Sequence, residues 1–119
     1  FTDDFRKQQP DVVEQTRKVV LANHPDNYAA HRLVLAEGVT ELIRPDPPIS
    51  HPTLVMTCEN DSGSTPAMSH AIASEIAGAK VHIARHLQHL GLIQDPKGFC
   101  DPIKAYLGPI LTKDKKDTA

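Results

Sequence analysis

The sequence predicts an α/β fold, because in its second half two short apolar runs alternate with two segments of helical periodicity. The first run, residues 53–58, is apolar at consecutive positions and predicts a strand buried on both faces. The second run, residues 80–84, predicts another short strand. A chain order of strand, helix, strand, helix is typical of parallel sheets, so we expect the two strands to be parallel.

A helix is predicted after each strand. Thr65 and Pro66 open the first, which we expect to end at Gly78, and Pro96 opens the second. The apolar positions recur at helical spacing, and we expect them to be core residues. They are Met68, Ile72 and Ile76 in the first helix and Phe99, Ile103 and Leu107 in the second.

The first third of the chain is also predicted to be helical. One helix starts at Pro10, with Asp11 in its first turn, and ends near Asn23. A second helix covers about residues 26–37, with Gly38 as its C-cap.

A stretch with four prolines, residues 43–52, separates this helical part from the α/β part. Proline lacks an amide proton and restricts the preceding residue, so an extended connector is predicted there. The expected organisation is a helical part at 1–42, the connector at 43–52, an α/β segment at 53–111 and a solvated tail at 112–119.

Composition excludes several classes of protein. The 119 residues carry a net charge of −2 without a cluster of Lys and Arg, so no nucleic-acid partner is expected. There is no apolar run of membrane-spanning length, we expect no signal peptide, and the two cysteines do not suggest a disulfide framework. We therefore expect a cytoplasmic protein without a membrane partner. Because the chain opens at Phe1 rather than at Met, we also expect a fragment or a processed product.

Two segments carry a resemblance to a known family. Residues 51–66, HPTLVMTCENDSGSTP, resemble the penultimate core strand of α/β-hydrolases, PTLVLxGExDxxxTP, in which the Asp is the acid of the catalytic triad. That Asp corresponds to Asp61. Residues 78–96 resemble the last core strand and the loop that carries the triad histidine, which corresponds to His89. The two residues would then project from the carboxyl ends of adjacent parallel strands, where open α/β sheets bind ligands.

The resemblance implies the C-terminal part of an α/β-hydrolase fold, with residues 1–42 as the end of its helical cap. The enzymes it is most similar to are enol-lactonases and related hydrolases. It implies hydrolysis of a small ester, lactone or related carbonyl substrate by a Ser-His-Asp mechanism, without a cofactor or a metal. In that mechanism the histidine takes the serine proton and returns it to the leaving group, while the acid orients the ring.

The nucleophile is missing from this pattern. The sequence has no G-x-S-x-G motif, so we expect the chain alone to be inactive. Two strands also leave unpaired edges, and we expect either a missing N-terminal half or a second copy of the chain as partner. The alternative is a non-catalytic, truncated hydrolase that acts as a self-associating or partner-binding module.

Two departures from the family pattern leave further alternatives open. The first is Cys58, which stands where the family usually has Gly. The second is the segment from His86 to His89, which replaces the usual Gly-x-Gly-His and makes His86 a rival for the triad position. If residues 80–93 were helical, His82, His86 and His89 would share one face. A His-rich metal-binding module is therefore a third hypothesis.

Overall fold

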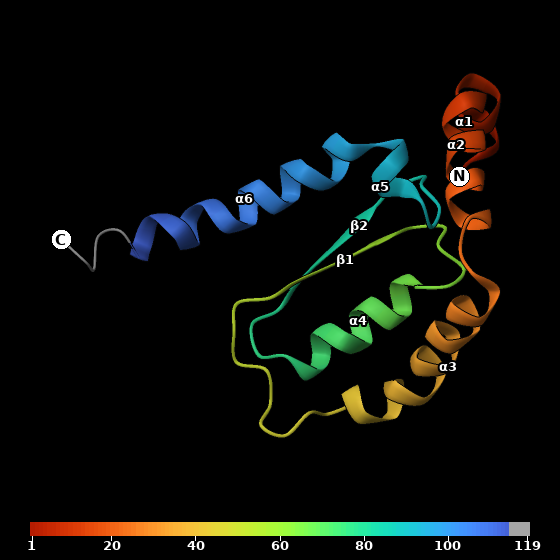
Figure 1. Cartoon of the computed structure of the whole chain (residues 1–119). Helices are drawn as coiled ribbons and strands as arrows, with labels where there is room; N and C mark the ends of the chain where they lie inside the picture. Colours follow the sequence, from red (N-terminus) through yellow and green to blue (C-terminus); the bar gives the residue numbers. More distant parts are fainter. Residues whose placement is uncertain (115–119) are drawn as a thin grey trace. The chain divides into compact units, whose positions relative to one another are not determined.

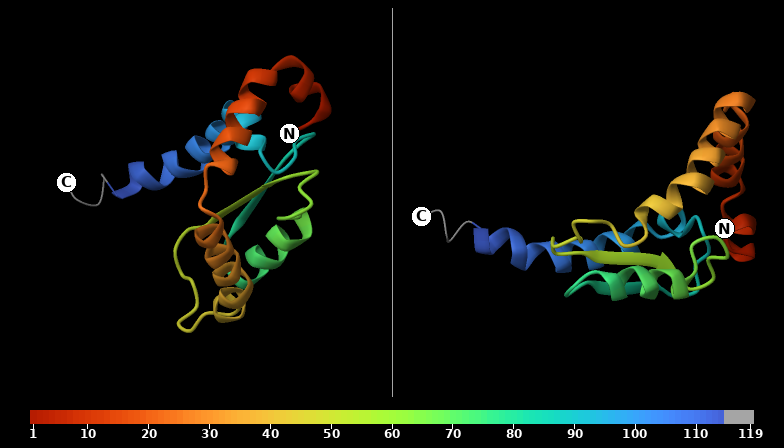
Figure 2. Two further views of the ribbon diagram at one scale, coloured as in Figure 1. Left: turned by 45° about the vertical axis from the view of Figure 1, so that its right-hand side comes forward. Right: turned by 90° about the horizontal axis from the view of Figure 1, so that it is seen from below.

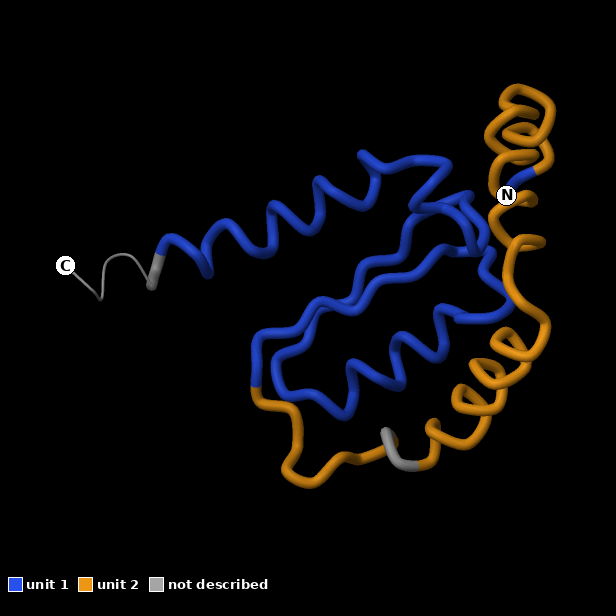
Figure 3. The backbone as a smooth tube through the Cα atoms, in the orientation of Figure 1, with its two compact units in different colours: residues 1–2, 51–119 blue, residues 3–50 orange. Residues whose placement is uncertain are grey.

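The computed structural model describes residues 1–114, with side chains described for all of these except 41, 42, 113 and 114. Within residues 1–114 the chain forms six helices and two strands (Figure 1). They fall into two compact units (Figure 3). One unit comprises residues 3–50, and the other comprises residues 1–2 together with 51–119.

The first unit is helical, as predicted, and contains α1 (Asp3–Gln8), α2 (Pro10–Leu21) and α3 (Pro25–Leu42). The predicted start of α2 at Pro10 is confirmed. The prediction that Gly38 caps the next helix is wrong, because α3 continues through Gly38 to Leu42. A glycine inside a helix costs only about 1 kcal/mol, and the residues that follow Gly38 contain no helix breaker until the connector. The helix ends where Ile43 adopts an extended backbone.

The second unit is built on a two-stranded parallel sheet of β1 (Leu54–Cys58) and β2 (Lys80–Ala84). The register pairs Leu54 with Lys80 and Cys58 with Ala84, so both strands end at the same edge. The predicted parallel arrangement is therefore confirmed. The expectation that β1 is buried on both faces is wrong for its first half. Leu54, Val55 and Met56 are only half-buried, whereas Thr57 and Cys58 are buried.

Helix α4 (Pro66–Glu75) connects the strands, runs alongside them and contacts both (Figure 2). Thr65 caps it by accepting a hydrogen bond from the backbone N–H of Met68. The predicted core face of this helix is wrong at two positions, since Met68 and Ile72 are about half exposed, at 52% and 51%. Ser69 is the buried position within the helix instead, whereas Ile76, the C-cap residue that follows α4, is buried as predicted. The small side chain of Ser69 thus lies on the buried side of the helix, and the bulkier Met68 and Ile72 are left largely exposed.

Two helices follow β2, namely the short α5 (Gly91–Gln94) and the long α6 (Pro96–Asp114). The predicted start at Pro96 is confirmed. Residues 112–114, which were expected to be tail, belong to this helix, and residues 115–119 lie outside the described part of the chain. Only the beginning of the predicted apolar face reaches the core, because Phe99 packs against it while Ile103 and Leu107 are 38% and 41% exposed.

The core of this unit is small. It consists of Cys58 at the end of β1, Ala84 at the end of β2 and Leu87 in the loop that follows, with Phe99 packed against them. It therefore lies at the carboxyl ends of the strands, beneath the two segments that carry the candidate site residues. No helix among residues 1–114 has the length and apolar character needed to cross a membrane.

Candidate functional site

Asp61 lies on the turn that follows β1, and its side chain is held by the backbone of that turn. Its Oδ1 accepts hydrogen bonds from the N–H groups of Gly63 and Ser64, at 2.8 and 2.9 Å. The hydroxyl of Thr57 donates to the carbonyl of Ser64 and so fixes the far end of the turn. Asp61 is only 6% exposed. The turn therefore sets both the position and the orientation of the carboxylate.

His89 lies on the loop that follows β2, and this loop is joined to the Asp61 turn by an extension of the sheet. Beyond the last strand pair, the N–H of Glu59 donates to the carbonyl of Ala84, and the N–H of Asn60 donates to that of Leu87, both at 2.9 Å. These bonds bring the ring of His89 to Asp61, where its Nδ1 lies 2.9 Å from Oδ2. The structure thus brings together the two residues that the sequence singled out.

Hydrogen bonding keeps the carboxylate ionised. Burial raises the pKa of Asp61, but hydrogen bonds from the Ser64 N–H, from His89 and from the Gly63 N–H together bring that pKa below its ordinary value. An ionised carboxylate accepts hydrogen bonds only, so the proton on Nδ1 must belong to the ring of His89. The side chain of His89 is 66% exposed, and its Nδ1 is the ring atom that is paired with Asp61.

The rival histidine, His86, is not paired with Asp61. It lies at the start of the same loop with a φ of 61°, and its side chain is 90% exposed. Its backbone N–H donates to Oε2 of Glu59 at 2.8 Å, and its Nδ1 lies 3.7 Å from that oxygen. Glu59 could not be singled out from the sequence, because its partner is a backbone group 27 residues away.

The helix on which the metal hypothesis depended is not formed. Residues 80–84 are strand β2, so His82 belongs to a strand while His86 and His89 lie on the loop that follows. The three rings therefore do not share a helical face. Among the described residues, no group of three or more His, Cys, Asp and Glu side chains is placed to hold a metal ion.

Cys58 is a packing residue. It is 3% exposed, and burial raises the pKa of its thiol, although the N–H of Gly91 acts in the opposite direction. A Cβ at position 91 would lie 2.4 Å from Sγ of Cys58, so this position requires glycine for a close approach. The Cys58–Gly91 contact therefore anchors the end of the His89 loop against β1.

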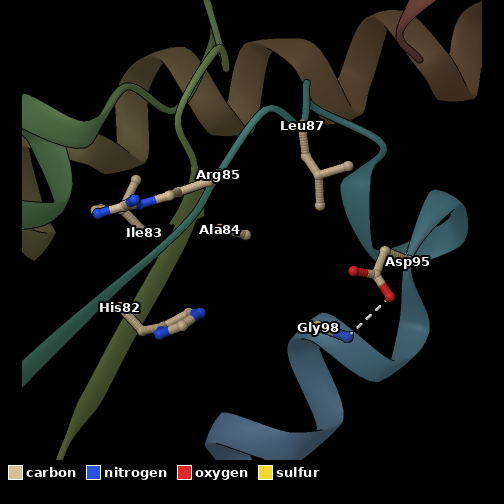
Figure 4. Close-up of a pocket in the computed structure, with 7 residues that line it drawn as sticks. All are labelled: His82, Ile83, Ala84, Arg85, Leu87, Asp95 and Gly98. Atoms are coloured by element: carbon tan, nitrogen blue, oxygen red, sulfur yellow. Dashed lines mark hydrogen bonds between the residues drawn. The ribbon is translucent and has the colours of Figure 1, made fainter. Parts of the chain in front are cut away.

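A shallow hollow of about 380 Å³ lies on the other side of this loop, between β2 and the start of α6 (Figure 4). The side chains of Leu87 and Asp95 line it, and Asp95 also accepts the N–H of Gly98 at the beginning of α6. Neither Asp61 nor His89 lines the hollow. It is therefore not a substrate pocket for that pair.

The comparisons with known proteins identify no relative: no protein-family model matches the chain, and neither a curated protein nor a solved structure matches it. The hydrolase resemblance therefore rests on the residues quoted above and on no wider match.

Proposed function

We propose that Asp61 and His89 are the acid and the histidine of a Ser-His-Asp hydrolase that acts on a small ester, lactone or related carbonyl compound. The observation that carries the proposal is the arrangement of the pair. A buried carboxylate is held by two backbone N–H groups on one oxygen and by Nδ1 of His89 on the other, while the histidine ring is largely exposed. This is the arrangement that a catalytic histidine requires from its orienting acid.

The chemistry follows from the hydrogen bond between the two residues. With its proton on Nδ1, the ring of His89 has a lone pair on Nε2 that accepts the proton of a serine hydroxyl. Asp61 fixes this tautomer and stabilises the imidazolium that forms, without itself taking the proton. His89 then returns the proton to the leaving group, and the acyl-enzyme is hydrolysed by water in the same way.

The nucleophile is proposed to come from outside these 119 residues. The five serines of the chain lie outside any G-x-S-x-G pattern, and the hydroxyl of one of them, Ser74, donates to a carbonyl of its own helix. The small core and the two-stranded sheet also favour additional strands beside β1, since such a sheet buries too little apolar surface to be stable alone.

The test is turnover by the polypeptide as it occurs in its native source, measured with p-nitrophenyl acetate and a simple lactone. We expect His89→Ala and Asp61→Asn each to lower kcat by about 10³- to 10⁴-fold. His86→Ala is the matched control and should change kcat less than about twofold, because the ring of His86 is not bonded to Asp61. The reverse pattern for the two histidines would contradict the proposal. So would a native polypeptide of only 13.0 kDa that lacks esterase activity.

A second candidate function is a self-associating or partner-binding module without catalysis. The observation that favours it is exposed apolar surface in the unit that contains the sheet, in particular Met68 and Ile72 on α4 and Leu107 on α6. Sedimentation and an esterase assay of the native polypeptide distinguish the two candidates. A stable dimer of a native 13.0 kDa chain that has no hydrolytic activity, and whose dimerisation does not change in His89→Ala, would support the module and count against the enzyme.

A further inference from the structure

The loop that carries His89 is tied to the turn that carries Asp61 by the side chain of Glu59. Glu59 is the first residue after β1, and its Oε2 accepts the backbone N–H of His86 at 2.8 Å. At the next residue along the loop, the carbonyl of Leu87 accepts the N–H of Asn60. The loop is therefore fixed at two consecutive residues, shortly before His89. Of these two bonds, only the one to Glu59 depends on a side chain.

His86 needs such a bond because of its backbone conformation. Its φ of 61° lies in the left-handed region, which is unfavourable for any residue with a Cβ. A hydrogen bond from its N–H to a charged carboxylate is stronger than one to a neutral acceptor, and so it offsets that cost. The contact between the imidazole of His86 and Glu59 contributes little, because it is 3.7 Å long and the ring is 90% exposed.

The geometry points to Glu59 as a positioning residue, which holds His86 in the left-handed conformation and thereby directs His89 onto Asp61. Its catalytic consequence rests on the proposed function, whereas its effect on His89 is measured without any substrate. Glu59 is not proposed to touch a reactant. It is proposed to act only through the backbone of the loop.

The experiment is nitrogen NMR of the histidine rings in the protein labelled with ¹⁵N-histidine, at a pH where imidazole is neutral. The signal of His89 is assigned by its loss in His89→Gln. In the unmodified protein we expect His89 to carry its proton on Nδ1, because that atom is bonded to Asp61. Glu59→Ala should lower the ratio of the Nδ1–H to the Nε2–H tautomer by about threefold or more, since the ring loses its fixed partner.

Two further variants separate positioning from a general disturbance of the turn. Glu59→Gln should restore most of the tautomer ratio, because its amide oxygen accepts the same N–H, although more weakly than the carboxylate does. Asn60→Ala removes an exposed side chain from the same turn while leaving the backbone bond to Leu87, and it should have no effect. The inference would be overturned if Glu59→Ala left the tautomer ratio of His89 unchanged. It would also be overturned if Asn60→Ala lowered that ratio as much as Glu59→Ala does.

Hydrogen exchange provides a measurement that needs no substitution, and it holds even if Glu59→Ala does not fold. The amide of His86 should exchange about tenfold or more slowly than an unprotected peptide amide. Exchange at the unprotected rate would show that the bond to Glu59 does not persist and would overturn the inference.

Kinetics of the active protein then separate the inference from the proposed function. Glu59→Ala should lower kcat by about tenfold with little change in KM, and Glu59→Gln should restore it. Wild-type kcat in Glu59→Ala together with an unchanged tautomer ratio would refute the role of Glu59 and leave the proposed hydrolase intact. The expected tautomer shift in a protein that never hydrolyses an ester would support the positioning role and refute the hydrolase.

Discussion

Replacing Gly91 with alanine tests whether the His89 loop is anchored as the structure shows. The added Cβ would lie 2.4 Å from Sγ of Cys58 and 3.0 Å from Cβ of Leu87. Carbon and sulfur atoms do not approach so closely, and both neighbours belong to the small core, so they have little room to move. Overpacking costs about 1 to 3 kcal/mol, and a contact of 2.4 Å places this substitution in the upper part of that range, at about 2 to 3 kcal/mol. The better helix propensity of alanine in α5 recovers at most about 1 kcal/mol. We therefore expect a net loss of about 1 to 2 kcal/mol in the free energy of unfolding.

The assay is urea unfolding followed by circular dichroism. Gly108→Ala is the matched control, since no atom lies within 4 Å of an added Cβ there and Gly108 also belongs to a helix. It should be neutral or stabilising by up to about 1 kcal/mol. In the Cys58→Ala background, Gly91→Ala should cost clearly less, because the sulfur that it meets is gone. A Gly91→Ala protein as stable as the wild type would refute the packing argument.

Three further predictions concern the same unit. Because folding lowers the pKa of Asp61, its contribution to stability should be complete above the ordinary Asp pKa of 3.8 and should disappear as the pH falls through the lower folded value. In urea unfolding, the loss of free energy of unfolding caused by Asp61→Asn should therefore be larger at pH 7 than at pH 2. Ile76→Ala should cost about 2 to 4 kcal/mol and Met68→Ala less than about 1 kcal/mol in thermal unfolding, since only Ile76 is buried; equal losses would contradict the assigned face of α4. A thiol reagent should modify the exposed Cys100 at least about tenfold faster than the buried Cys58 in the folded protein, and equal rates would show that the core is open.

The sequence was sufficient to predict the elements on which the candidate site is built. The strands and helix starts depend on local chemistry, such as apolar residues at consecutive positions or a proline in the first turn. From these signals and the order of the elements, β1, β2 and their parallel pairing were predicted. Asp61 and His89 were singled out by the hydrolase resemblance, and the parallel order of the strands predicted that the segments after their carboxyl ends lie together.

The parts that could not be predicted depend on tertiary contacts. Periodicity favoured the bulky apolar side chains of Met68 and Ile72 as the core face of α4, whereas the side of the helix that is buried carries Ser69. Glycine is a common C-cap residue, but nothing in the local sequence shows whether a helix will end at Gly38 or continue past it. Glu59 was missed because a bond between a side chain and a distant backbone N–H leaves no pattern in the sequence.

The most direct test of the central claim is labelling of the native polypeptide with a fluorophosphonate, followed by mass spectrometry of the modified peptide. Such a reagent reacts with a serine that is activated by a histidine. The proposal predicts one labelled serine outside residues 1–119, with labelling lost in His89→Ala and retained in His86→Ala. Labelling that persists in His89→Ala, or labelling of Ser62 or Ser64 within the Asp61 turn, would contradict the assignment of Asp61 and His89 as two members of a triad completed from elsewhere.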